Sequence, residues 1–99
     1  MNISVRRTGG FAGLTEELGT VDTEHLDSTL AQQIEEKIRS LNFFALPATV
    51  AGDSVGADMY RYEITVREGD HTHTVAFQDD GSPQTAPLRQ LVDTISGMV

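Results

Sequence analysis

The segment from Asp58 to Glu68 constrains the fold of this chain more strongly than any other, because its side chains alternate in polarity. Aromatic and aliphatic side chains occupy every second position, namely Tyr60, Tyr62, Ile64 and Val66. Charged and hydroxyl side chains occupy the positions between them, namely Arg61, Glu63, Thr65 and Arg67. Because successive side chains of a strand point to opposite faces of a sheet, the alternation predicts a strand with one buried and one solvated face.

Three further segments are predicted to form strands beside it. Residues 1–8 alternate in the same way, and the segment Leu14–Val21 is predicted as a second strand. The glycine-rich run Gly9–Gly13 between them predicts a hairpin with a five-residue loop. Residues 68–71 predict a tight turn, after which residues 72–78 form the fourth strand.

Two segments carry apolar side chains at helical spacing. The first begins near Asp27 and Ser28, either of which can cap a first turn, although a start near Asp22 fits the same pattern. Its apolar stripe consists of Leu30, Ile34, Ile38 and Leu41. The second is predicted to begin at Thr85 as the cap, with Pro87 in the first turn, where a missing N–H costs little. Its stripe consists of Leu88, Leu91, Val92 and Ile95.

The connection between the two halves is less regular. Pro47 ends the first helix, and Phe43, Phe44 and Leu46 before it are expected to form a hydrophobic plug under the edge of the sheet. Residues 48–57 contain three alanines and two glycines, which predicts a flexible connection with a short strand near residues 49–50. The element order ββαββα predicts an α+β fold, a four-stranded antiparallel sheet with both helices packed on one face and solvent on the other.

Composition narrows the class of protein. With 99 residues the chain is expected to form one domain over residues 1–99, and without cysteine it has no disulfide or thiolate metal site. No apolar run approaches the roughly 20 residues of a membrane span, and no signal peptide is evident, so we expect a cytoplasmic protein without membrane contact. The net charge of −8 argues against nucleic-acid binding and favours either a basic partner or simple solubility.

No arrangement of residues predicts catalysis or a cofactor. No serine lies in a nucleophile motif, and the adjacent carboxylates point apart on strands or helices. His71 and His73 share a strand face and could form part of a Zn²⁺ site, but no third ligand has the required spacing, so two partly exposed histidines are the simpler interpretation. Residues 79–82 lack the full calcium-loop pattern and are predicted to be a turn. We therefore expect a non-enzymatic protein that binds another protein.

The glycine-rich loop, which consists of Gly9, Gly10, Phe11, Ala12 and Gly13, admits two interpretations. It lacks the Gly-Lys-Ser/Thr ending of a phosphate-binding loop, so the simpler interpretation is an ordinary hairpin turn. The sharper interpretation depends on Phe11, because an aromatic side chain between glycines at a loop tip is difficult to bury. Exposed there, it would serve as an anchor for a pocket on a partner.

Several segments resemble one family of small bacterial proteins. They are Val5–Gly13, Asn42–Pro47, Asp58–Tyr62 and the final helix from Pro87 and Leu88, so the resemblance covers nearly the whole chain. The chain is similar to emfourin and its relatives, the protealysin inhibitors. This resemblance implies an inhibitor of thermolysin-like, protealysin-type zinc metalloproteinases that blocks the substrate cleft stoichiometrically.

The resemblance and the residues together give two candidate contact surfaces. Thermolysin-like proteases prefer a large apolar residue after the scissile bond, so Phe11 on a rigid Gly9–Gly13 loop would be a plug for that pocket. Leu26 and Leu30, near the start of the first helix, are a second candidate surface, although Leu30 also fits the core stripe. The alternative function is a non-inhibitory interaction module, such as a homodimer formed by edge-strand pairing, and we favour a monomer.

Overall fold

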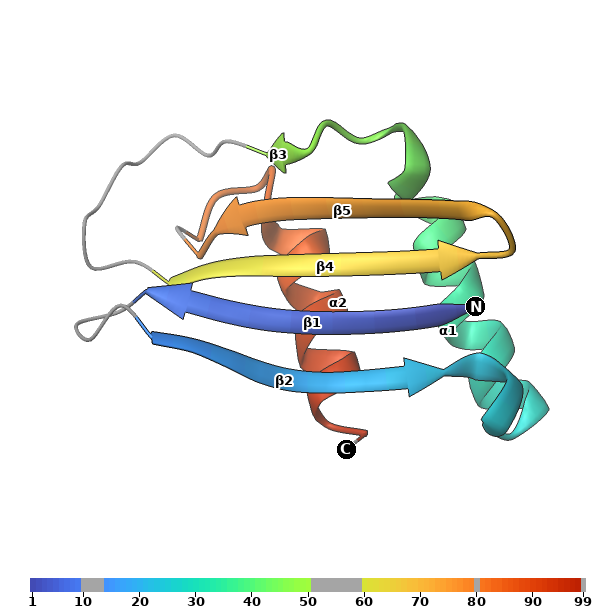
Figure 1. The fold of residues 1–99 in the computed structure, drawn as a ribbon. Coiled ribbons are helices and arrows are strands. Elements are labelled where there is room, and N and C mark those ends of the chain that lie inside the picture. Colours follow the sequence, from blue (N-terminus) through green and yellow to red (C-terminus); the bar gives the residue numbers. More distant parts are fainter. Residues whose placement is uncertain (10–13, 51–59, 80, 99) are drawn as a thin grey trace.

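The computed structural model describes residues 1–9, 14–50, 60–79 and 81–98, and it packs one β-sheet against two α-helices (Figure 1). The elements in chain order are β1 (Asn2–Gly9), β2 (Leu14–Asp22), the 3-10 helix η1 (Thr23–His25), α1 (Ser28–Ser40), the 3-10 helix η2 (Phe43–Ala45), β3 (Thr49–Val50), β4 (Tyr60–Glu68), β5 (His71–Gln78) and α2 (Ala86–Ser96). Both α-helices lie on the same face of the sheet, as predicted, and no described helix covers the other face. No helix in the described ranges is long and apolar enough to span a membrane.

The sheet has five strands in the order β2-β1-β4-β5-β3, so the prediction of four antiparallel strands was wrong in number and in type. The four long strands pair antiparallel, but β3 runs parallel to β5, with Val50 opposite Phe77. The Ala76 N–H also donates to the Ala48 carbonyl oxygen at 2.8 Å. The edge of β5 thus finds backbone partners in a two-residue segment, at the place where a short strand was predicted.

Both predicted hairpins form. In the first, Gly9 pairs with Leu14 and is the last residue of β1, whereas it was predicted as the first residue of the loop. In the second, Glu68 pairs with His71, which leaves a two-residue turn that begins at Gly69. Gly69 has a φ of 59°, a conformation that this turn type requires and that glycine adopts without steric cost.

A β-bulge interrupts the pairing of β1 with β2. The register shifts just before Arg6, so β2 carries one extra residue, Leu18. Leu18 is partly buried and packs against the core. As a result Arg6 lies opposite Glu17, and the next pair along the strands is Arg7 opposite Glu16.

The core lies between the helices and the face of the sheet that they cover. Its buried side chains come from both helices, η2 and the four long strands, namely Ile3, Val5, Val21, Ile34, Ile38, Phe43, Tyr62, Ile64, Val66, Val75, Phe77, Leu88, Leu91, Val92 and Ile95. In the predicted stripe of α1, Ile34 and Ile38 are buried, whereas Leu30 and Leu41 are only partly buried against the core. The alternation of β4 is confirmed from residue 62 onward, but Tyr60, which the same pattern places inward, is 40% exposed.

The predicted helix starts are correct, but the predicted side-chain caps are not. Asp27 precedes α1 and Thr85 precedes α2, yet neither side chain makes a capping hydrogen bond. Thr85 has φ −99° and ψ −14°, not the extended backbone of a side-chain cap, and its hydroxyl donates to the Ser82 carbonyl oxygen at 3.2 Å. Pro87 lies in the first turn of α2, as predicted.

Truncation of a central core side chain should lower the stability of this fold. Ile64 is 0% exposed, so Ile64→Ala is expected to reduce the free energy of unfolding by about 2–5 kcal/mol through lost burial and a residual cavity. Thr72→Ala, at an exposed position of β5, is the control and should change it by less than about 1 kcal/mol. Urea-induced unfolding measures both. Equal losses in the two variants would contradict the assignment of Ile64 to the core.

Candidate functional site

The residues that flank the glycine-rich loop lie together at one end of the sheet. Gly9 ends β1 with a φ of 105°, a conformation that favours glycine, and it pairs with Leu14 of β2 and with Tyr60 of β4. The other four residues predicted for this loop lie outside the described residues, namely Gly10, Phe11, Ala12 and Gly13. The site is therefore built from the three strand ends that meet at Gly9.

Arg7, Glu16 and Tyr60 form a group at this end that we term the Arg7 cluster. Arg7 Nη2 donates to Glu16 Oε2 at 2.6 Å, and Arg7 Cζ lies 4.3 Å from the centroid of the Tyr60 ring. The first contact is a charge-assisted hydrogen bond and the second is a cation–π contact. The cluster joins β2, β1 and β4 just before the loop. The sequence carried one signal of this cluster. Arg7 falls on the same alternate positions of β1 as the core residues Ile3 and Val5, so its side chain lies on the face of the sheet that the helices cover.

The Arg7 guanidinium is held in its charged form. Its hydrogen bond with Glu16 raises the pKa of Arg7 above the ordinary value, and burial acts in the opposite direction. A hydrogen-bonding contribution from Tyr62 adds to the rise. The side chain is 27% exposed, and its Nε–H has no hydrogen-bond acceptor in the described part of the chain. The Glu16 carboxylate is therefore the main group that neutralises the positive charge of Arg7, which is permanent and largely shielded from solvent.

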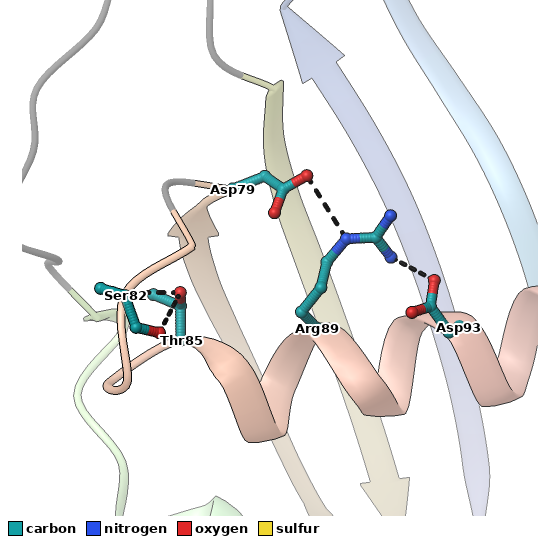
Figure 2. A network of polar contacts seen from close by, with 5 residues as sticks. All are labelled: Asp79, Ser82, Thr85, Arg89 and Asp93. Carbon is teal, nitrogen blue, oxygen red and sulfur yellow. Dashed lines mark hydrogen bonds and ion pairs between the residues drawn. The ribbon is translucent and has the colours of Figure 1, made fainter.

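A second arginine lies over the neighbouring tyrosine of β4. Figure 2 shows the Arg89 side chain of α2 between two carboxylates, with Nε donating to Asp79 Oδ2 at 3.4 Å and Nη1 paired with Asp93. Arg89 Cζ also lies 4.8 Å from the centroid of the Tyr62 ring. Burial lowers the pKa of Arg89, but the charges of its partners more than offset this effect, so its pKa is raised. These four residues, termed the Arg89 cluster, fix the segment after β5 against α2.

The segment that leads into α2 is also tied to the helix. The Ser82 and Thr85 hydroxyl oxygens lie 3.2 Å apart, as seen at the left of Figure 2. Gly81 has a φ of 72°, which is turn geometry. Of the turn predicted over residues 79–82, Asp80 lies outside the described residues.

Leu26 and Leu30, the second candidate surface, lie at the opposite end of the sheet. The Thr23 N–H donates to the Met1 carbonyl oxygen at 2.9 Å, which places the segment before α1 beside the start of β1, whereas Gly9 is its end. At about 3.3 Å per residue, the two ends of this strand are roughly 25 Å apart. Both leucines are partly buried and pack against the core. The structure therefore does not bring the two predicted groups together.

An aromatic group lies beside the turn between β4 and β5. Of the predicted hydrophobic plug, Phe43 is buried and Leu46 packs against the core, but Phe44 is 39% exposed. The Phe44 ring contacts His71 and His73, with ring centroids 6.2 and 6.4 Å apart. His73 Nε2 lies 2.7 Å from the Leu46 carbonyl oxygen and must carry a hydrogen to make this bond, so this ring nitrogen is not free to bind a metal ion. Among the described residues no three potential ligands cluster around a metal position.

Comparison with known proteins gives one positive result. The family model described as Emfourin matches residues 5–96. Neither the curated proteins nor the solved structures gave a match. The matched range contains both α-helices, every residue of the two arginine clusters and β1 from Val5 onward. Because the match spans nearly all of the 99 residues, the chain belongs to the emfourin family.

Proposed function

We propose that this protein inhibits a thermolysin-like, protealysin-type zinc metalloproteinase by occupying its substrate cleft as a one-to-one complex. Membership of the emfourin family over residues 5–96 is the observation that carries this proposal. In this proposal the protein acts by binding alone, with no cofactor and no catalytic step of its own.

The Gly9–Gly13 loop is the proposed contact, with Phe11 as the side chain that enters an apolar pocket of the protease. Support comes from the strands that carry the loop. Gly9 is paired on both sides, and the charge-assisted bond between Arg7 and Glu16 joins β1 to β2 at the base of the loop. A loop whose ends are already fixed loses less conformational freedom on binding, so more of its contact energy appears as affinity.

Leu26 and Leu30 are the second proposed contact. They lie roughly 25 Å along the sheet from Gly9, so a pocket that takes Phe11 cannot also take Leu30. Their packing against the core gives both leucines a structural role in the free protein. We therefore place the loop first and the leucines second.

Self-association through strand edges is the alternative function, and the edge of β2 opposes it. β2 is outermost on its side of the sheet, and its exposed residues include Glu16 and Glu17. Antiparallel pairing of two copies with the register centred on Glu16 and Glu17 would bring these like charges together. The bulge at Leu18 also distorts the edge, a known protection against such pairing. We therefore expect a monomer that binds a protease.

A titration of protease activity tests the proposed function. The purified protein is added to thermolysin and to a protealysin-type protease while the cleavage of a small peptide substrate is followed. We expect activity to fall linearly and to reach its minimum near a one-to-one ratio, because each inhibitor molecule occupies one cleft. The His71→Ala variant is the control for zinc chelation and should titrate identically. Undiminished activity of both enzymes at a large molar excess would remove the proposal.

A pair of substitutions decides between the two proposed contacts. Phe11→Ala should raise the inhibition constant about 30-fold or more, as expected for a buried aromatic hot spot. Leu30→Ala should leave the inhibition constant within about threefold while lowering the free energy of unfolding by about 1–2 kcal/mol, because Leu30 packs on the core. Inhibition kinetics and urea unfolding measure the two effects. The reverse pattern would move the contact to the opposite end of the sheet.

A further inference from the structure

Two large apolar side chains of the described residues are substantially exposed, and they lie at opposite ends of the sheet. Phe44 is 39% exposed and Tyr60 is 40% exposed. The Phe44 ring contacts His71 beside the β4–β5 turn, whereas Tyr60 begins β4 directly opposite Gly9. Because the two side chains are almost equally exposed but lie far apart, substitution of one can serve as the control for substitution of the other in a binding experiment.

Tyr60 belongs to the core-facing row of β4 but is not enclosed by the core. The next residue of this row, Tyr62, is 2% exposed and stacks on Phe77 with ring centroids 5.5 Å apart. Tyr60 instead has the Arg7 guanidinium against its ring and leaves two-fifths of its surface exposed. A partly exposed tyrosine is among the side chains that most often supply binding energy at protein interfaces.

The Tyr60 ring is exposed but restrained. The Arg7 guanidinium that lies against it is fixed by Glu16 at 2.6 Å. The Tyr60 carbonyl oxygen also accepts a hydrogen bond from the Asp79 N–H at 2.9 Å. Side chain and backbone are therefore both held before any partner arrives. An aromatic side chain held in this way loses little rotamer freedom on binding.

We propose that Tyr60 is a second aromatic contact with the metalloproteinase, inserted in an apolar pocket beside the segment that follows Gly9, and that Arg7 positions its ring. This inference rests on the proposed function. The partner is the protease because Tyr60 adjoins, through direct strand pairing, the loop proposed as the contact. The Arg7 charge behind the ring is already paired with Glu16, so the pocket needs no counter-charge of its own.

Inhibition constants of four proteins test the role of Tyr60. Tyr60→Ala should raise the inhibition constant of the protein about 20-fold or more, mainly through faster dissociation. Tyr60→Phe keeps the ring and should stay within about threefold, as should Phe44→Ala at the far end of the sheet. Thermal unfolding of each variant shows whether the fold is intact. If Tyr60→Ala does not unfold cooperatively, Tyr60→Thr replaces it, because threonine keeps the preference for a strand.

A double-mutant cycle tests the positioning role of Arg7. Arg7→Met removes the cation and its bond to Glu16 while keeping a flexible apolar stem. It should raise the inhibition constant about fivefold in the parent protein and have almost no effect in the Tyr60→Ala background. Equal effects in both backgrounds would overturn the positioning role, because a general loss of stability does not depend on the presence of the Tyr60 ring.

The outcomes separate this inference from the proposed function. A parent protein that inhibits neither protease overturns both. A parent that inhibits while Tyr60→Ala inhibits equally well overturns the role of Tyr60 and leaves the proposed function standing. Equal losses for Tyr60→Ala and Phe44→Ala also overturn it, because two residues at opposite ends of the sheet cannot share one pocket.

Discussion

The side of β1 that faces the helices changes from aliphatic to cationic within one strand, and the rest of the structure depends on this change. Ile3 and Val5 are fully buried beneath the helices, and Arg7 is the next residue of the same row. A guanidinium at the border of an apolar core requires partners, since an unpaired charge there would cost several kcal/mol. Glu16 of β2 and the ring of Tyr60 from β4 meet this requirement. The row therefore forms a core over most of its length and a polar end beside the glycine-rich loop.

The bulge in β2 determines which glutamate meets which arginine. With the extra residue Leu18 accommodated there, Glu16 lies opposite Arg7 and Glu17 lies opposite Arg6 on the other face. An unbroken register would have placed Leu18 opposite Arg6 and Glu17 opposite Arg7, which would expose a leucine and leave Arg6 without a facing carboxylate on β2. The bulge instead lets Leu18 pack against the core, so one local irregularity serves packing and charge pairing together.

Elements whose apolar pattern repeats over many residues were predictable from the sequence. Features that depend on which other elements pack against a residue were not. The alternation through β4 and the stripes of α1 and α2 extend over enough residues to identify the elements and most of their buried side chains. A short strand was predicted near residues 49–50, but β3 has two residues and no period, so its parallel pairing with β5 was not predictable. The alternation of β1 predicts that Arg7 lies on the same face as Ile3 and Val5. Its pairing with Glu16 was not predictable, because that pairing depends on the bulge in β2. Tyr60 continues the alternation of β4 and was predicted inward, yet a strand's own pattern does not reveal where the covering layer ends.

The charges at the loop end of the sheet bear on which interactions would hold a partner there and which would attract it from a distance. Two arginines near this end are paired with carboxylates, Arg7 with Glu16 and Arg89 with Asp79 and Asp93, whereas the whole chain carries a net charge of −8. A partner that covers these two arginines buries charges that already have partners, which costs far less than burying a lone charge. The net charge of the whole chain acts at a distance on the approach of a partner. In the proposed complex, affinity at this end therefore depends on aromatic contact, and the net charge governs the rate of encounter.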